Sequence, residues 1–310
     1  GSVGDRMNAL AKDPRYKVPD NDAGRAEITA YIQTWLGKIR AELPRAFRTL
    51  MKGNVEVKRL PLAEEPGAPA AYGGAGSIDG SIPGKFWINL RTTELHSKYS
   101  LPDLTMHEAI PGHVWQGEYA NQMPLIRTML AFNAYSEGWA LYAEQLADEL
   151  GLYDDFEVGR LGYLQSLAFR ACRLVVDTGL HAKRWTREQG VEFFVKENGS
   201  NPLEVASEVD RYCSWAGQAC GYKVGHSEIV RQRAGPVEKH IANHLSIPAN
   251  FNLIQDIEEA RFGDGCINVL DLHTASFDNL QWGEVNATCG EASFQSVKKV
   301  IELAMAGKLD

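Results

Sequence analysis

The sequence of 310 residues is poor in several features that mark other classes of protein. Its five cysteines are odd in number and scattered, with no CxxC pair, which favours free thiols in a reducing compartment over a disulfide framework. No apolar run approaches the roughly 20 residues needed to span a bilayer, and the start shows no signal peptide. We therefore expect a soluble protein without a membrane span. A cytoplasmic location is favoured, and an exported form is left open.

Basic blocks and nucleotide-binding motifs are also missing. Lysine and arginine are dispersed, and the formal net charge of −8 argues against nucleic acid or an anionic membrane as the main partner. There is no GxGxxG or Walker-type phosphate loop, and no serine or cysteine lies in a nucleophile elbow. With 44% hydrophobic and 23% charged residues, the composition is that of a globular protein with a sizeable core. No pattern indicates the oligomeric state.

The hydrophobic pattern predicts a mainly α fold of the α+β class. Residues 1–100 are expected to hold an amphipathic helix over 22–43, stopped by Pro44, and then a small twisted sheet that includes residues 55–57 and 85–90.

Residues 101–246 are predicted to be helical and to carry a metal site. Residues 247–310 have mixed signals and an undetermined fold, apart from an amphipathic helix expected over 294–306. We expect the three regions to form one continuous domain.

The most informative stretch is His107-Glu108-Ala109-Ile110-Pro111-Gly112-His113, with Glu137 further along the chain. Two imidazoles and a carboxylate are a zinc ligand set that leaves one position open for water. The histidines are too far apart to face one ion from an unbroken helix, but Pro111-Gly112 allows a bulge or kink that brings them together. The pattern predicts His107, His113 and Glu137 as ligands and Glu108 as the general base.

The helix that carries Glu137 has two further features. Glu144 lies two turns beyond Glu137 on the same face, where it can accept a hydrogen bond from the second ring nitrogen of a ligand histidine. Glycine and alanine beside Glu137 allow a neighbouring helix to approach closely.

Four ordered motifs resemble a family of bacterial proteins, domain of unknown function 885. They are HEAIPGH at 107–113, YSEGWALYAE at 135–144, LVVDTGLHAKRWTREQ at 174–189 and EVDRYCSWAGQACGYKVG at 208–225. That family is grouped with zincin metallopeptidases of the gluzincin type, whose third zinc ligand is a glutamate. The resemblance implies a zincin-like fold, with a small twisted sheet beside an active-site helix, and one bound zinc ion with the ligands and base named above.

The resemblance also implies residues that contact the substrate. Related zincins use a tyrosine or histidine to stabilise the oxyanion, which makes Tyr222 the first candidate and His181 the second. Arg211 is a candidate for binding a substrate carboxylate, and Tyr212 lies beside it. The segment 85–90, which contains Asn89, is the candidate strand for main-chain pairing with a peptide.

Two departures from the family pattern stand out. Members usually carry a second histidine immediately after the one that matches His113, whereas this chain has Val114. They also tend to have a long helical N-terminal half that has no counterpart here, so the chain is either a fragment or a shortened form.

The function expected from these features is hydrolysis of a peptide or peptide-like amide bond by a zinc-activated water. Two alternatives remain. The chain is a catalytically inactive, zincin-like binding or accessory protein, or it is a non-haem iron enzyme that uses the same two histidines and carboxylate as a facial triad.

Overall fold

In the computed structural model, the residues described are 2–52, 54–129, 132–244, 250–260, 266–270 and 299. They fall into two compact units, residues 1–229 and 230–310. The first unit takes in the expected sheet region and most of the expected helical region. Each unit is described by itself.

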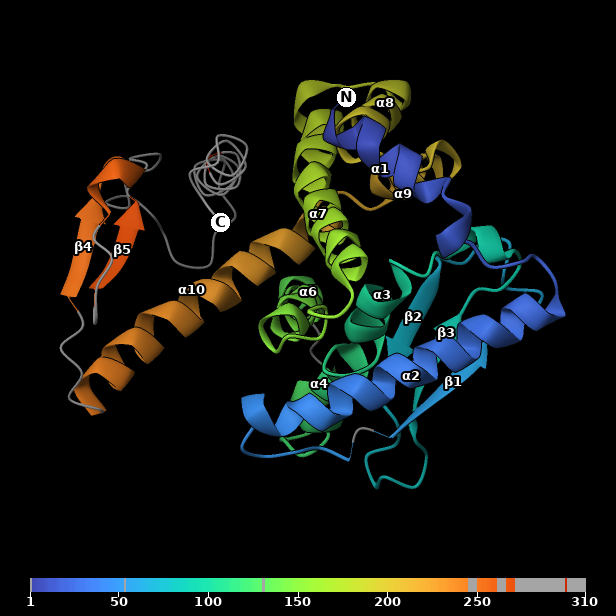
Figure 1. Cartoon of the computed structure of the whole chain (residues 1–310). Helices are drawn as coiled ribbons and strands as arrows, with labels where there is room; N and C mark the ends of the chain where they lie inside the picture. The colour runs from blue at the N-terminus through green and yellow to red at the C-terminus, as the bar shows by residue number, and fades with distance from the viewer. Residues whose placement is uncertain are drawn as a thin grey trace. The chain divides into compact units, whose positions relative to one another are not determined.

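The first unit is mainly helical, which confirms the predicted fold class (Figure 1). Its helices are α1 (Val3–Ala11), α2 (Asp22–Ala46), α3 (Leu101–Glu108), α4 (His113–Ala120), α5 (Ile126–Met129), α6 (Asn133–Glu149), α7 (Glu157–Lys183), α8 (Arg187–Asn198), α9 (Pro202–Ser214) and α10 (Gln218–His244), the last of which continues into the second unit. Short 3-10 turns occur at η1 (Pro14–Tyr16) and η2 (Thr93–Leu95).

A small mixed sheet accompanies these helices. Its strands are β1 (Val55–Arg59), β2 (Ala71–Gly74) and β3 (Gly84–Ile88), in the order β1-β3-β2. β3 pairs in parallel with β1 and antiparallel with β2. The prediction that residues 85–90 pair with a peptide substrate is therefore wrong, because both edges of β3 already carry a strand. β1 and β2 are the edge strands of this sheet, and β2 is the one that runs antiparallel to β3.

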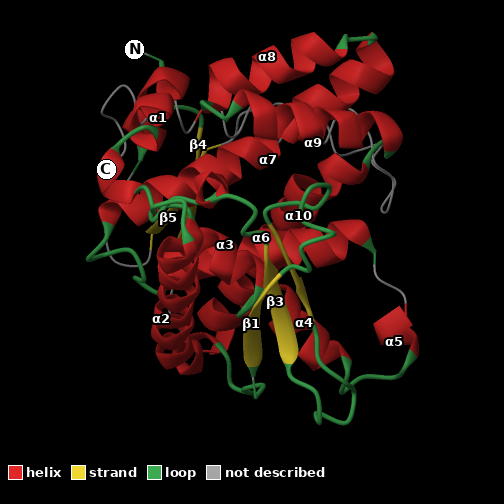
Figure 2. Ribbon diagram, turned by 90° about the vertical axis from the view of Figure 1, so that its right-hand side faces the viewer, coloured by secondary structure: helices red, strands yellow, loops and turns green. Residues whose placement is uncertain are grey.

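The main core lies between α2 and the sheet (Figure 2). Residues of α2 at three- and four-residue spacing form its buried face: Ile28, Ile32, Trp35, Leu36, Ile39 and Leu43. Phe86 and Ile88 of β3 alternate with partly exposed residues and join the same cluster as Met106 of α3. Pro44 does not stop α2, which continues to Ala46, so Pro44 lies in its last turn.

A second hydrophobic cluster joins α7, α8, α9 and the start of α10. It contains Val176, Phe194, Val205, Val209, Tyr212 and Ala219, all almost fully buried. This cluster fixes α9 and the first turns of α10 against α7, and these are the segments that carry the remaining candidate site residues.

The second unit contains a parallel strand pair, β4 (Asn250–Ile254) with β5 (Cys266–Leu270), and a 3-10 turn, η3 (Ile257–Glu259). The helix predicted over 294–306 lies outside the described residues, apart from residue 299.

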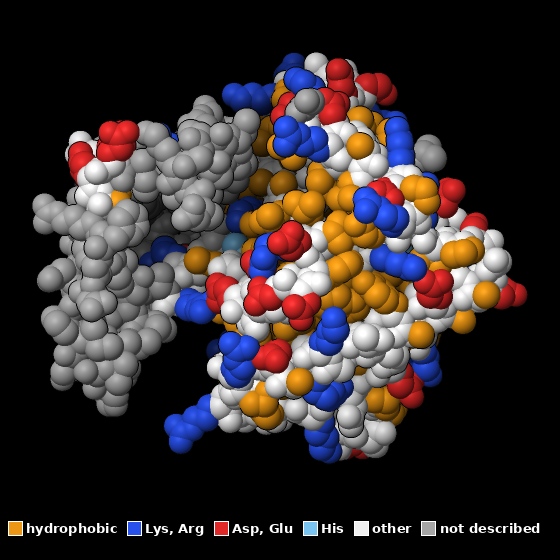
Figure 3. Space-filling model, viewed as in Figure 1, with side chains coloured by type: hydrophobic (Ala, Val, Ile, Leu, Met, Phe, Trp, Pro, Cys, Tyr) orange, Lys and Arg blue, Asp and Glu red, His pale blue; other side chains and the backbone are white. Residues whose placement is uncertain are grey.

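Apolar side chains gather on the face of the first unit that is turned to the viewer in Figure 3, which is the face that carries α2. The stretch around α5 lies on another side of this unit (Figure 2). Several large side chains between α4 and the start of α6 are strongly exposed: Tyr119, Met123, Leu125, Ile126, Met129, Phe132 and Tyr135. None of the helices in the part of the chain described here has the length and apolar character needed to cross a membrane.

Candidate metal centre

The motif segment forms two helices separated by a break. α3 ends at Glu108, Ala109 and Gly112 have non-helical backbone angles, and α4 begins at His113. Gly112 packs on the His107 carbonyl oxygen so closely that a Cβ atom at this position would lie 1.8 Å from it. The interruption at Pro111-Gly112 is therefore a complete break between helices, larger than the expected bulge or kink.

This break brings the two histidines together. Their ring centroids lie 5.0 Å apart, and the rings are nearly perpendicular. Oε2 of Glu137, in the first turns of α6, lies 3.1 Å from Nε2 of His113 and 3.5 Å from Nε2 of His107. Ligand atoms of a tetrahedral zinc ion are separated by about 3.3 Å, which is close to both distances from Glu137. The three ligand atoms all lie within 4.8 Å of one another.

The hydrogen-bonding state of these atoms also fits a cation. Nδ1 of His107 lies 2.6 Å from Oε1 of Glu144, a carboxylate that accepts the Nδ1 proton. Nε2 of His107 then carries a lone pair directed toward the other ligands. Oε2 of Glu137 is buried and has no hydrogen-bond partner among the described residues. Together with a ring nitrogen of His113, these atoms form a group of three possible ligand atoms that could hold a metal ion.

The pKa values of His107 and Glu137 support the interpretation of this cluster as a candidate metal site. Burial opposes a charge on His107, yet its close contacts with the carboxylates of Glu137 and Glu144 raise its pKa to about 10. Burial likewise opposes a charge on Glu137, but the two histidines hold its pKa well below the usual value. The site therefore strongly favours positive charge between these side chains.

Glu144 is completely buried and is held by a network from α7. Ser166 donates to its Oε2 atom at 2.7 Å, and Arg170 donates to the Ser166 hydroxyl at 2.5 Å. Burial raises the pKa of the neighbouring Asp103 well above its usual value, and repulsion from Glu144 raises it further. Although burial opposes it, attraction from Arg170 and the contact with His107 lower the pKa of Glu144, which remains the ionised partner.

Ser166 and Arg170 are site residues that the sequence analysis missed. They lie four residues apart on α7, which is the spacing of one helix face. In the sequence, only this spacing indicates that the two side chains lie on the same face of α7. It does not indicate which other helix that face contacts.

Glu108 follows His107 directly and is buried beside the ligands. Burial raises its pKa, while attraction from the two histidines and a hydrogen bond from the Gly73 backbone amide lower it in part. Gly73 of β2 approaches so closely that a Cβ atom there would lie 1.9 Å from the Glu108 carbonyl oxygen. The edge strand β2 therefore lies directly against the residue predicted to act as the base.

Close contact between α6 and α10 positions Tyr222. A Cβ atom on Gly138 would lie 2.4 Å from the backbone of Gly225, and one on Gly225 would lie 1.7 Å from the Ala134 carbonyl oxygen. The predicted close approach of a helix at Gly138 is thus found in the structure. It brings the Tyr222 ring 6.1 Å from the His107 ring, nearly parallel to it.

The Tyr222 hydroxyl accepts hydrogen bonds and retains its own proton. Arg211 donates to it at 3.2 Å and Gln218 at 3.5 Å. Because both partners can only donate through these nitrogens, the Tyr222 proton is available to a further acceptor. Of the residues predicted to contact substrate, Tyr222 and Arg211 are the two that the structure connects to the ligand histidines.

Three other predicted residues are placed differently. Asn89 is fully buried, and its side-chain amide donates to three carbonyl groups in the turn before β2, so it cannot contact a substrate. Tyr212 is 1% exposed within the second hydrophobic cluster, which corrects its assignment to substrate binding. His181 is exposed, and its Nε2 atom lies 3.0 Å from the Tyr212 carbonyl oxygen, so it contacts α9 and none of the three ligands.

Val114 does not occupy a ligand position. Its side chain is 1% exposed, and its Cγ1 atom packs against Gly84 at the start of β3. The side chain at position 114 therefore faces the sheet, while His113 faces Glu137. The lack of a second histidine after His113 leaves the three-ligand cluster intact.

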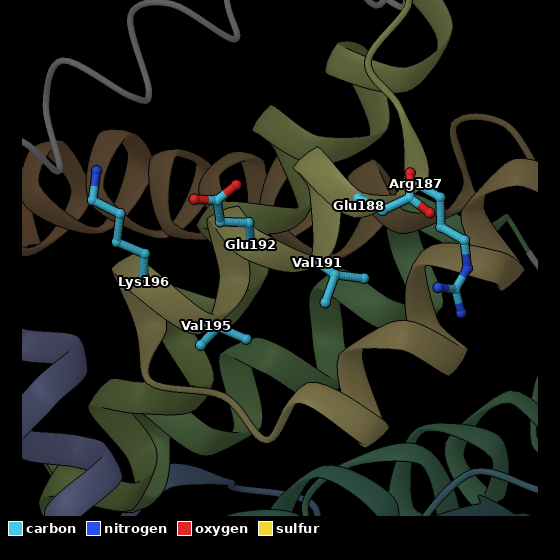
Figure 4. A pocket seen from close by; sticks show the side chains of 6 residues that line it. All are labelled: Arg187, Glu188, Val191, Glu192, Val195 and Lys196. Carbon is cyan, nitrogen blue, oxygen red and sulfur yellow. The ribbon is translucent and has the colours of Figure 1, made fainter.

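A separate hollow of about 500 Å³ lies on the outer surface of α8 (Figure 4). It is lined by Arg187, Glu188, Val191, Glu192, Val195 and Lys196. All six residues belong to one helix, and none is a predicted site residue. The hollow is therefore not part of the candidate metal centre.

Two solved structures resemble the chain. A protein described as a "putative lipoprotein" from Colwellia psychrerythraea superposes over 77% of this chain with a TM-score of 0.73 and 43% sequence identity. A "putative lipoprotein of unknown function" from Shewanella oneidensis superposes over the same share with a TM-score of 0.53 and 23% identity, which shows a shared fold. The matches span 41% and 48% of those two chains.

A short stretch also resembles curated proteins of another kind. Over 64 residues, or 21% of this chain, the sequence is 38% identical to a "Putative D-threonate 4-phosphate dehydrogenase" of Fusobacterium nucleatum, of which the match spans 19%. The longest similarity is to a family profile described as "Bacterial protein of unknown function (DUF885)", which matches residues 1–240. This match covers well over half of the chain, which therefore belongs to the DUF885 family of bacterial proteins.

Proposed function

We propose that the chain is a zincin-like metallopeptidase that hydrolyses a peptide or peptide-like amide bond. The observation that carries the proposal is the arrangement of His107, His113 and Glu137, whose three ligand atoms lie within 4.8 Å of one another, with Glu137 at 3.1 and 3.5 Å from the two imidazoles. A zinc ion held there would polarise the substrate carbonyl and lower the pKa of a bound water toward ~7.

Glu108 is suited to move the proton of that water. It adjoins His107, it is buried, and its raised pKa makes it a stronger base than an exposed glutamate. In the reaction, the water oxygen bonds to the scissile carbonyl carbon and the C–N bond breaks. One water proton passes through Glu108 to the leaving amine, so that atoms and charges balance.

Tyr222 is suited to stabilise the oxygen of the scissile carbonyl as negative charge develops. Its hydroxyl accepts from Arg211 and keeps its own proton as a donor. Its ring lies nearly parallel to that of His107, which supports a position beside the reacting group.

The free edge of β2 offers main-chain pairing for an extended peptide. β2 pairs with β3 on one side only, and Gly73 lies against Glu108. A peptide added to this edge would run past the proposed base, which replaces the role first expected of residues 85–90.

The names of the two structural relatives bear on the compartment. Both describe lipoproteins, and this gives no support to the cytoplasmic location favoured from the cysteine pattern. We therefore favour an exported setting for this chain. Fractionation of cells that produce the natural protein tests this part of the proposal.

Substitution of Glu108 by glutamine tests the catalytic role most simply. We expect Glu108→Gln to retain stoichiometric zinc, because Glu108 is not a ligand, and to lose hydrolysis of an N-acetylated peptide mixture followed by mass spectrometry. Undiminished turnover by the zinc-loaded variant would reject Glu108 as the base. Iron in place of zinc in protein purified without added metal would favour the facial-triad alternative.

A further inference from the structure

Three arginines lie close to Tyr222. The guanidinium carbon of Arg173 lies 4.2 Å from the centre of the Tyr222 ring, and that of Arg170 lies 5.7 Å from it. Arg211 reaches the hydroxyl of the same tyrosine. Two of these residues come from α7 and one from α9, so two distant segments converge on one aromatic side chain of α10.

Some of the N–H donors of these arginines have no acceptor nearby. Arg173 donates to Glu208 at 2.6 Å, and its side chain is only 6% exposed, yet its Nε and second terminal nitrogen are buried without an acceptor. The Nε atoms of Arg170 and Arg211 are also buried without an acceptor among the described residues. Buried guanidinium donors left unpaired are costly, and the attraction of a nearby anion to the positive charge of the cluster would offset that cost.

Arg211 is the member of the cluster that a ligand can reach. Its side chain is 31% exposed, and it is held in place by Gln218 at 2.7 Å and by the Tyr222 hydroxyl. Arg173 contacts two of the same residues as Arg211, namely Glu208 and Tyr222.

The position of Arg211 sets a length for the ligand. The Tyr222 ring centre lies 6.1 Å from that of His107, and the Tyr222 hydroxyl lies 3.2 Å from Arg211. The separation of His107 and Arg211 is therefore on the order of 10 Å, the length of about three extended residues. Glu208 lies 3.7 Å from Arg211 and would repel a doubly charged phosphate more than a carboxylate. A singly charged group at the end of a short peptide segment fits both conditions.

We propose that Arg211 binds the free C-terminal carboxylate of the peptide substrate, with Arg173 adding positive charge and Gln218 orienting the guanidinium. The substrate class is then a peptide with an unblocked C-terminus, cut within about three residues of its end. This inference rests on the proposed function, since it assigns the cleavage position relative to the same metal centre.

The test uses the zinc-loaded full chain and two matched probes. One is a mixture of N-acetylated tetrapeptides with free C-terminal carboxylates, and the other is the same mixture with C-terminal amides. We expect kcat/KM to be about ten- to a hundredfold higher for the free acids, the range for a charged hydrogen bond. Arg211→Gln should remove this preference, so that the variant shows the same kcat/KM on the free acids and on the amides.

Arg187→Gln serves as the matched control, because Arg187 is an exposed arginine paired with Asp210 on the outside of α8. The control should keep the preference for free acids. Equal cleavage of acids and amides by the unmodified chain would overturn the proposal, and so would an equal loss on both mixtures in Arg211→Gln.

A binding measurement separates this proposal from the hydrolase assignment. In zinc-loaded Glu108→Gln, the free acids should raise the melting temperature more than the amides, and adding Arg211→Gln should abolish the difference. If neither mixture is cleaved but the acids still stabilise, the hydrolase assignment fails and the carboxylate site stands. If both mixtures are cleaved alike and stabilise alike, the hydrolase assignment stands and the carboxylate site fails.

Discussion

Nδ1 of His107 lies 2.6 Å from Oε1 of Glu144, and both side chains are almost fully buried. This contact fixes the proton of the imidazole on Nδ1 and leaves Nε2 free to bind a cation. Because Ser166 and Arg170 hold Glu144 in turn, the orientation of a ligand atom on α3 depends on residues of α7.

Glu144→Gln should weaken zinc binding about ten- to a hundredfold, because the ring of His107 would lose its charged acceptor. Competition with a chromophoric chelator measures this change. Glu149→Gln is the matched control at the exposed end of the same helix, where we expect the zinc affinity of the unmodified chain. Equal affinity of Glu144→Gln and the unmodified chain would show that the contact does not support the metal site.

Gly225→Ala should disturb the contact between α6 and α10, because the new methyl group would meet the Ala134 carbonyl oxygen of the backbone. We expect a loss of about 1–3 kcal/mol in the free energy of unfolding, together with weaker zinc binding, since Glu137 lies on the displaced helix. Denaturant titration and chelator competition measure the two effects.

Gly37→Ala provides the control for that substitution. Gly37 lies within α2 with no atom near its Cβ position, so alanine should raise stability by up to about 1 kcal/mol. If both glycine variants behaved alike, the close helix contact at Gly225 would have no energetic importance.

The cluster of two histidines and a glutamate was more predictable from sequence than its surroundings. The spacing of His107, His113 and Glu137, with a helix break between the first two, limited the ways in which they could meet. Glu144 followed from the period of a helix that already carried Glu137. The relative positions of two side chains could therefore be predicted from the sequence when both residues lay on one helix or on either side of one short turn.

Residues positioned by tertiary packing were less predictable. Asn89 and Tyr212 have polar side chains and were therefore predicted to contact a substrate. Both are buried in the folded protein, so neither can do so. β3 lies in the centre of the sheet because of the order of the strands. The hydrophobic pattern of the three strands does not predict that order. The convergence of Arg173 and Arg211 on Tyr222 joins three helices, and no spacing along the chain indicates it.

Val114→Ala should destabilise the fold without affecting the metal. Val114 packs against Gly84, so the loss of two methyl groups should cost about 1–3 kcal/mol of unfolding free energy. The zinc affinity should stay within about twofold of the unmodified chain, because this side chain faces the sheet. A large loss of zinc affinity with little loss of stability would place Val114 at the metal and contradict the assignment.

His226 predicts a pH dependence of stability. Burial, and to a smaller extent the positive charge of Lys223, whose Nζ lies 3.2 Å from Nδ1 of His226, lower its pKa to about 3. An unfolded histidine titrates near ~6.5, so between that pH and about 3 the unfolded state binds a proton that the folded state does not. The free energy of unfolding should therefore fall as the pH drops through this range, by up to about 1.4 kcal/mol per pH unit from this residue.

Urea unfolding at pH 7 and pH 5 measures the effect of His226. His226→Gln cannot take up the proton, so we expect it to lose about 2 kcal/mol less than the unmodified chain between these pH values. An identical loss in both proteins would show that His226 is protonated as readily in the folded state as in the unfolded one.

Anomalous diffraction from crystals of the zinc-loaded protein, recorded at the zinc absorption edge, tests the central claim most directly. We predict one strong peak in contact with Nε2 of His107, Nε2 of His113 and Oε2 of Glu137, with a water molecule completing the tetrahedron. A zinc-loaded crystal without a peak between these three side chains, or with the ion bound elsewhere, would contradict the account.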